Sequence, residues 1–103
     1  KPHGMAYKLR FHELAWAEWQ KLDGSIQTPL KKKLLERLEQ PRVPAAALSG
    51  MADCYKIKLR QAGYRLIYRV DDDVVTVSVI AVGKRDKLAA YTTAGQRLSD
   101  QIK

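Results

Sequence analysis

Two segments in the second half of the chain place basic residues at alternate positions. The cations of segments 54–60 and 63–70 are Lys56, Lys58, Arg60, Arg65 and Arg69. Because successive side chains of a strand point to opposite faces, each segment is predicted to be a strand with one apolar and one cationic face. Arginine can bind phosphate oxygens in pairs, and lysine adds a compact charge. The pattern therefore predicts a phosphate-binding surface.

The register of these two strands decides whether their cations share one surface. A three-residue turn would bury two of the arginines, whereas a two-residue turn at Ala62–Gly63 pairs apolar residues with apolar ones. We expect the two-residue turn, which sets Arg60 opposite Arg65 and Lys56 opposite Arg69. Like charges in such pairs destabilise a sheet by about 0.2–1 kcal/mol each. The alternative to a functional surface is a solvated edge that discourages aggregation.

Lysine and arginine suit different parts of phosphodiester chemistry. A lysine amine can move a proton. An arginine stays charged and can stabilise the negative charge that builds on a phosphorane. The only histidines are His3 and His12. No metal-ligand spacing, glycine-rich phosphate loop or Ser-His-Asp arrangement appears, so no cofactor is expected.

Length and charge narrow the class of protein. The chain has 103 residues, enough for one hydrophobic core, and 46% of them are hydrophobic, enough for a folded domain. Residues 1–4, ahead of Met5, are interpreted as a remnant of an expression tag, and 5–103 as the single domain. The net charge of +8 implies a polyanionic partner such as nucleic acid, the ribosome, an anionic membrane surface or an acidic protein.

Two further features concern the compartment. Cys54 is the single cysteine and cannot form an internal disulfide, which fits a reducing environment. No apolar run approaches the length of a membrane span, and no signal peptide opens the chain. We therefore expect a cytoplasmic protein without a membrane partner.

The apolar periodicity predicts the order of the elements. The expected elements are a strand at 6–12, helices at 13–22 and 25–40, a loop at 41–50, strands at 54–60, 63–70 and 74–82, and a helix at 86–102. This order predicts an α+β fold, in which an antiparallel sheet of about four strands has the two N-terminal helices on one face. Trp16 and Trp19 are expected in the core, and Cys54 is expected to be a small buried hydrophobe.

Several stretches of the chain resemble the RelE family of bacterial toxins. The stretches are 50–60, 63–68 and 82–85, with shorter matches at 5–7 and 30–34. The likeness covers nearly the whole chain from Met5 onward. It implies a RelE-like fold, similar to that of microbial ribonucleases, and a type II toxin that cuts messenger RNA in the ribosomal A site. In this family the ribose 2′-hydroxyl attacks the adjacent phosphate without a metal, leaving a 2′,3′-cyclic phosphate and a 5′-hydroxyl.

The resemblance also implies which residues are functional. The family's catalytic set falls on Lys56, Lys58, Arg65, Arg85 and Tyr91. We expect Lys56 to help to remove the 2′ proton and Lys58 to protonate the leaving oxygen, although the two roles stay open. The arginines would bind the phosphate, and Tyr91 would stack on a base or orient the 2′-hydroxyl.

Further basic residues are candidates for RNA binding. They are Arg60, Arg69 and Lys84, together with a basic helix face at Lys31, Lys32, Lys33 and Arg37. Such a helix face is often merely solvated, but charge and reach are all that a phosphate contact needs.

The resemblance implies several partners. They are the ribosome with its A-site messenger, a RelB-type antitoxin, and operator DNA bound by the toxin–antitoxin pair, while the toxin alone is expected to be a monomer. Two alternatives remain at this point. One is a toxin that cuts free RNA without the ribosome, and the other is a non-catalytic module that binds RNA or the ribosome.

Overall fold

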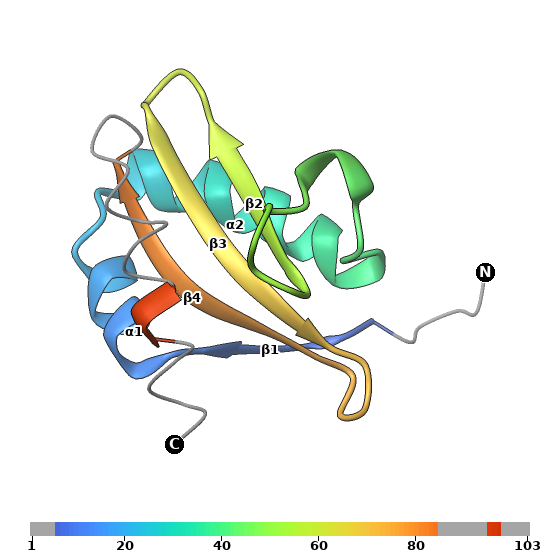
Figure 1. The fold of residues 1–103 in the computed structure, drawn as a ribbon. Coiled ribbons are helices and arrows are strands. Elements are labelled where there is room, and N and C mark those ends of the chain that lie inside the picture. Colours follow the sequence, from blue (N-terminus) through green and yellow to red (C-terminus); the bar gives the residue numbers. More distant parts are fainter. Residues whose placement is uncertain (1–5, 85–94, 98–103) are drawn as a thin grey trace.

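The computed structural model describes residues 6–84 and 95–97 and shows a four-stranded sheet with helices against one face (Figure 1). The elements are β1 (Lys8–Phe11), α1 (Glu13–Gln20), α2 (Gly24–Glu39), the 3-10 helix η1 (Pro44–Ala46), β2 (Cys54–Leu59), β3 (Tyr64–Asp71) and β4 (Thr76–Lys84). The predicted α+β class and four strands are confirmed. Residues 95–97 are helical, and the rest of the helix predicted at 86–102 lies outside the described residues, as do residues 1–4.

The strand order is β1-β4-β3-β2. The β2–β3 and β3–β4 pairs are antiparallel, as expected, whereas β1 pairs with β4 in the parallel direction. Only short connections force neighbouring strands to be antiparallel. Because both helices and two strands separate β1 from β4 along the chain, that constraint does not apply to this pair. The sheet is therefore mixed.

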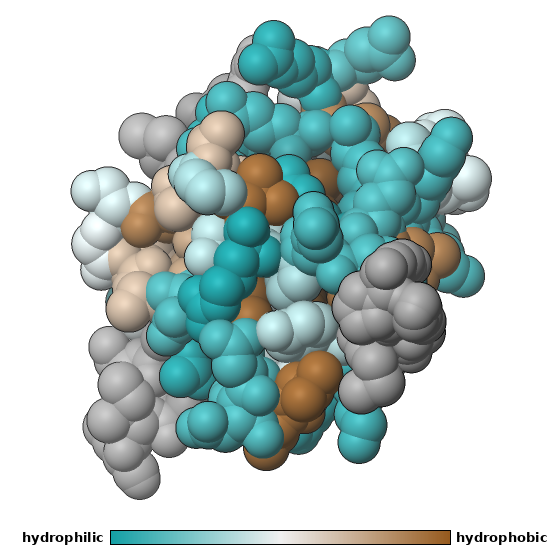
Figure 2. All heavy atoms as spheres, turned by 90° about the vertical axis from the view of Figure 1, so that its right-hand side faces the viewer, coloured by the Kyte–Doolittle hydropathy of each residue, from teal (hydrophilic) through white to brown (hydrophobic). Residues whose placement is uncertain are grey.

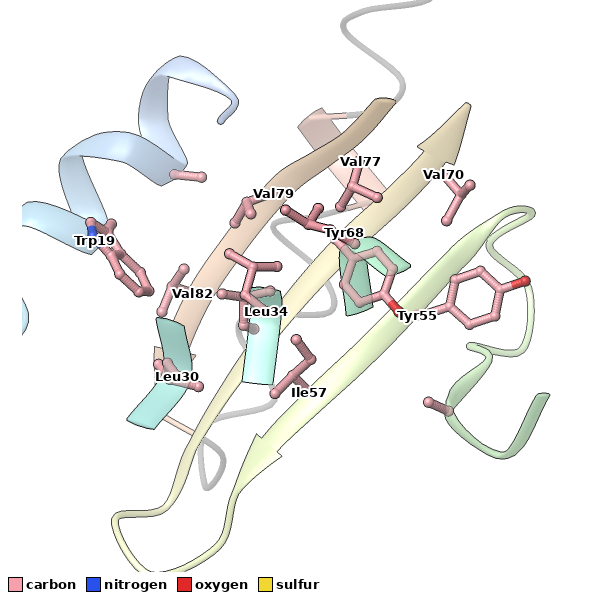
Figure 3. Close-up of a cluster of buried hydrophobic side chains, with 14 residues drawn as sticks. Trp19, Leu30, Leu34, Tyr55, Ile57, Tyr68, Val70, Val77, Val79 and Val82 are labelled. Carbon is pink, nitrogen blue, oxygen red and sulfur yellow. The ribbon is translucent and has the colours of Figure 1, made fainter. Parts of the chain in front are cut away.

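The core lies between the sheet and the two helices (Figure 3). Helix α1 contributes Ala15 and Trp19, and α2 contributes Leu30, Leu34 and Leu38, which are spaced four residues apart. The sheet contributes the apolar side chains of three strands, namely Tyr55, Ile57, Leu66, Tyr68, Val70, Val77, Val79 and Val82. The periodicity of the sequence thus predicted which faces meet.

Two of the three residues expected in the core are buried. Trp19 is 9% exposed and Cys54 is 1% exposed, and burial raises the pKa of the Cys54 thiol to about 11. The expectation for Trp16 is wrong, because this side chain is 46% exposed and packs edge-on against Phe11. Trp16 follows the fully buried Ala15, and one residue turns a helix by about 100°, so its side chain points away from the sheet.

Helix α2 begins earlier than the sequence suggested. Asp23 is the N-cap, and its carboxylate accepts a hydrogen bond from the Ser25 N–H at 3.0 Å, so Ser25 lies in the first turn. Pro29 lies inside the helix. Within residues 6–84 and 95–97, none of the helices combines the length and the apolar character that crossing a membrane requires.

The connection between β2 and β3 has four residues, 60–63, so the expected two-residue turn is wrong. The Gly63 N–H donates to the carbonyls of Leu59 at 2.9 Å and Arg60 at 3.2 Å. Gly63 has a φ of +71°, which glycine adopts without a steric penalty. The longer connection sets Lys58, rather than Arg60, opposite Arg65. A shift of two residues preserves the alternation, so the cations keep their predicted face.

Towards the C-terminal end of β4, side chains rather than a neighbouring strand bind the backbone groups on its outer edge. β1 pairs with β4 only from Thr76 to Val79. Beyond that point, a carboxylate oxygen of Glu18 accepts from the Val82 N–H at 3.1 Å, and Arg97 donates to the Ile80 carbonyl at 2.7 Å. Arg97 and Glu18 also form an ion pair at 3.0 Å. The pair therefore attaches residues 95–97 to the sheet beside α1 (Figure 1).

Replacing Glu18 with glutamine should test this ion pair. The change keeps the shape but removes the charge that meets the largely buried Arg97 guanidinium. Because the Glu18 side chain is itself 34% exposed, we expect the free energy of unfolding to fall by about 1–3 kcal/mol, measured by urea denaturation. Glu13→Gln, an exposed carboxylate in the same helix, is the control. Equal losses in both variants would show that the pair adds no stability.

A polar cluster connects the β3–β4 turn to two other segments. The Tyr7 hydroxyl donates to Asp72 at 2.7 Å, and Arg42 pairs with Asp72 at 2.9 Å and with Asp53 at 3.0 Å. The side of the molecule that carries this turn and the segment around η1 is largely hydrophilic (Figure 2). The hydrogen bonds from Tyr7 and then Arg42 hold the pKa of Asp72 below its ordinary value of 3.8.

The lowered pKa of Asp72 predicts a dependence of stability on pH. A folded-state pKa below the unfolded one means that this carboxylate stabilises the protein above pH 3.8, and that the stabilisation is lost as the pH falls through the folded value. Asp72→Asn should therefore lower the free energy of unfolding at neutral pH and flatten its decline between about pH 5 and about pH 2. Denaturation curves across this range test it, with the neighbouring Asp73→Asn as the control. Identical pH profiles for Asp72→Asn and the unchanged protein would contradict the assignment.

Candidate nucleic-acid interface and active site

Lys58 of β2 lies directly opposite Arg65 of β3, on the face of the sheet away from the helices. Lys56 is on the same face, opposite Ile67. On the other side of β3, the residue opposite Arg65 is Gly83 of β4. Both cations of the direct pair are half-buried. Three of the five residues expected to be catalytic thus share one face.

A β-bulge in β4 determines which residue lies beside Arg65. The register shifts at Ile80, so Val79 and Val82 both face the core although they are three residues apart. Gly83 consequently lies on the face of the sheet away from the helices. Because glycine has no side chain, β4 places no group next to the arginine at this position. The sequence shows the glycine but not the bulge that brings it there.

The two cation pairs expected from the shorter turn, Arg60–Arg65 and Lys56–Arg69, are not formed. Arg60 lies in the turn, and Arg69 is opposite Cys54. The β2–β3 ladder therefore contains one pair of directly opposed cations, where the sequence predicted two. The electrostatic cost of the cationic face is correspondingly smaller than the sequence suggested.

A groove of about 350 Å³ lies between α2, the segment around η1 and the open edge of β2. Five cations line it, namely Lys33, Arg37, Lys56, Lys58 and Arg60. A single carboxylate, that of Glu36, lies among them, and Val43 and Ala46 add apolar surface. The groove joins the two lysines expected to be catalytic to three residues expected to bind RNA. Such a concentration of positive charge attracts phosphate groups.

Arg37 has a structural role that the sequence did not reveal. Its Nη1 donates to the Lys56 carbonyl at 3.1 Å and to the Tyr68 hydroxyl at 2.9 Å, and the Tyr68 hydroxyl donates to the Pro41 carbonyl at 2.6 Å. Tyr68 is completely buried, and burial raises the pKa of its hydroxyl. The alternation of apolar and basic residues in segment 63–70 predicted only that Tyr68 lies on the apolar face of its strand. The structure shows that its hydroxyl joins β3 to Arg37 of α2 and to Pro41, while Arg37 itself joins α2 to β2.

Replacing Tyr68 with phenylalanine should loosen this wall of the groove. The change removes one hydroxyl that serves both Arg37 and Pro41, and leaves a buried carbonyl without its donor. We expect the free energy of unfolding to fall by about 1–3 kcal/mol, measured by chemical denaturation. Tyr64→Phe is the matched control, because Tyr64 is only half-buried on the same strand. A loss no larger than that of the control would argue against the hydrogen bonds.

The remaining candidates lie apart from this groove. Lys31 and Lys32 are exposed on α2 but do not line it. Arg69 is on the same face of the sheet as Arg65 but four positions further along β3. Lys84 is opposite Tyr64, so by alternation it points to the side opposite that of Arg65. Two expected catalytic residues fall outside the described part of the chain, namely Arg85 and Tyr91.

Comparison with known proteins identifies the family. Residues 9–89 match the profile of a family described as the ParE toxin of the type II toxin-antitoxin system, parDE. The chain belongs to the ParE/RelE toxin family. Relatives in this family include the mRNA interferase toxin RelE of Escherichia coli strain K12 and the mRNA interferase RelE of Shigella flexneri. Each is 54% identical over 94 residues, which are 91% of this chain and 99% of the relative.

Solved structures of ParE/RelE family members have the same fold. A double mutant of the Escherichia coli toxin RelE in the free state gives a TM-score of 0.84 at 53% identity, covering 89% of this chain and 97% of that one. A chain of the intact Escherichia coli RelBE toxin-antitoxin complex gives a TM-score of 0.76 at 58% identity, covering 77% of this chain and 96% of that one. The family resemblance noted in the sequence is confirmed.

Proposed function

We propose that this chain is the toxin of a type II toxin–antitoxin system and that it cuts messenger RNA in the ribosomal A site. The observation that carries the proposal is the direct pairing of Lys58 with Arg65, with Lys56 on the same face and in a groove lined by cations. Relatives at 54% identity are named mRNA interferases, which supports the same activity here. A basic surface built only for solubility would not need two half-buried cations in register.

The proposed reaction uses the substrate's own nucleophile. The ribose 2′-oxygen forms a bond to the adjacent phosphorus while the bond to the 5′-oxygen breaks, which gives a 2′,3′-cyclic phosphate and a 5′-hydroxyl. In this scheme Lys56, as a free amine, takes the 2′ proton, and Lys58 gives a proton to the departing 5′-oxygen. The scheme uses no metal, because the two lysines transfer the protons and the arginines stabilise the charge of the transition state.

The arginines of the proposed site have a different task. A guanidinium next to the scissile phosphate stabilises the extra negative charge of the transition state, and the pairing with Lys58 puts Arg65 beside a proton donor. Arg85 and Tyr91 complete the proposed set, Arg85 as a second phosphate ligand and Tyr91 as a base-stacking or 2′-hydroxyl-orienting group. Lys33, Arg37 and Arg60 would extend the contact along the RNA backbone.

The proposed partners follow from the family and from the charge. A chain of the Escherichia coli RelBE toxin-antitoxin complex has this fold, so a RelB-type antitoxin is the proposed inhibitor. The net charge of +8 suits a ribosome carrying A-site messenger and, for the toxin–antitoxin pair, operator DNA. We propose a cytoplasmic protein that is monomeric when the antitoxin is absent.

Removing either member of the Lys58–Arg65 pair should abolish cleavage. For Lys58→Ala and Arg65→Ala we expect the single-turnover rate on ribosome-bound message to fall by about 10²–10⁴, the range for lost proton transfer or charge stabilisation. The measurement maps the 5′ ends of the fragments and tests their 3′ ends for cyclic phosphate. Lys21→Ala, an exposed cation at the end of α1, is the control that removes one charge elsewhere.

Three outcomes would contradict the proposal in different ways. Equal cleavage of naked message and ribosome-bound message would point to a ribosome-independent ribonuclease. Translation arrest that survives Lys58→Ala and Arg65→Ala unaltered would point to a non-catalytic binding module. If Lys21→Ala lost as much activity as Lys58→Ala and Arg65→Ala, the loss would reflect the lower net charge rather than a role of the pair in catalysis.

A further inference from the structure

Two arginines outside the groove lie in one row across three strands. Arg10 of β1 is opposite Ser78 of β4, and Arg69 of β3 is opposite the same serine from the other side. All three are on the face of the sheet away from the helices, because their neighbours along each strand pack in the core. Neighbouring strands are about 4.8 Å apart, so the backbones of the two arginines are separated by about 10 Å with a hydroxyl between them.

This row lines a hollow of about 490 Å³ that is separate from the groove beside β2. No residue lines both hollows. Arg65 and Arg69 are four positions apart on β3, a distance of about 13 Å along the strand. Between them lies Ile67, which is buried with Ile80 in a small apolar cluster. The face of the sheet away from the helices thus has two sites with cations along β3, separated by buried apolar side chains.

The donors of this row are available to a ligand. Within the part of the chain that the structure describes, the side chains of Arg10 and Arg69 make no hydrogen bond and no ion pair. Two acids, Glu13 and Asp71, also line the hollow, yet neither is paired with these arginines. Asp71 instead accepts the N–H of Asp73 at 3.0 Å. Each guanidinium can therefore offer its five N–H donors outward.

His12 adds a further donor to the hollow. Its Nδ1 accepts a hydrogen bond from the Leu14 N–H at 3.1 Å, which caps α1. A neutral imidazole that accepts at Nδ1 carries its proton on Nε2. The lining thus combines two guanidinium groups, an imidazole N–H and two hydroxyls with the two carboxylates.

We propose that this hollow is a second phosphate-binding site, which takes a backbone phosphodiester of RNA at a distance from the scissile bond. The proposal rests on the proposed function, because it assumes that RNA is the ligand of this face. A cluster of donors that includes two unengaged guanidinium groups suits a phosphate, which is an anion with several acceptor oxygens. Its role is to hold the RNA in place while the Lys58–Arg65 pair acts on another phosphate.

The test measures RNA binding separately from cleavage. The probe is a single-stranded 2′-O-methyl RNA oligonucleotide, which has no free 2′-hydroxyl to attack, and a second probe is ribosomes without messenger. Each phosphate contact contributes about 0.7 to the slope of log affinity against log salt for single strands. For the oligonucleotide we expect the slope to fall by about 0.7 in the double variant R10Q/R69Q, which removes the single phosphate contact, by less in Arg69→Gln alone, and to change little in Lys21→Gln.

The outcomes separate this site from the proposed activity. A reduced slope with the oligonucleotide assigns the site to messenger, and a reduced slope with ribosomes alone assigns it to ribosomal RNA. Unchanged slopes with both probes overturn the site, even if the unchanged protein cleaves message. Binding that depends on Arg10 and Arg69 in a protein that never cleaves overturns the activity and keeps the site. R10K/R69K retains the charge and should retain the slope; a loss as large as that of R10Q/R69Q would contradict the assignment of the slope to the charges of these two residues.

Discussion

Burial of one face of the sheet against α1 and α2 determines where every basic side chain of β2 and β3 lies. The helices cover the side chains at Tyr55, Ile57, Leu66 and Tyr68, and a strand can then place the residues in between only on the opposite face. An unpaired charge inside the core would cost far more than a cationic surface costs. The same apolar pattern that stabilises the domain therefore also assembles its cationic face.

The contacts that hold this cationic face in place lie mostly on the opposite, helix-covered face of the sheet. Lys58 and Arg65 repel each other weakly, and the β2–β3 ladder that sets them opposite is held by hydrogen bonds and by the core. Arg37 reaches from α2 to the backbone of β2 and to the Tyr68 hydroxyl, so a wall of the groove is fixed by partly buried polar contacts. The side chains of the proposed site themselves need to contribute little to stability.

The sequence was sufficient for the faces of the elements and insufficient for their exact pairing. Alternation put Lys56, Lys58 and Arg65 on one face correctly, because a strand has a period of two whatever its neighbours are. The predicted turn length was wrong. A four-residue connection that ends at Gly63 pairs apolar residues with apolar ones just as a two-residue turn would, so the apolar pattern could not distinguish the two. The parallel pairing of β1 and the bulge at Ile80 depend on contacts far apart in the chain, which no local pattern encodes.

The way in which β4 ends has a consequence for association between molecules. A bare strand edge offers N–H and carbonyl groups that can recruit a strand from a second molecule. Here β1 is short, and Glu18 and Arg97 occupy the Val82 N–H and the Ile80 carbonyl. A strand from a second molecule would have to displace the Glu18–Arg97 ion pair before it could bind the Val82 N–H or the Ile80 carbonyl. The contact between α1 and residues 95–97 thus also protects this edge of the sheet, at the end of β4, from pairing with a strand of another molecule.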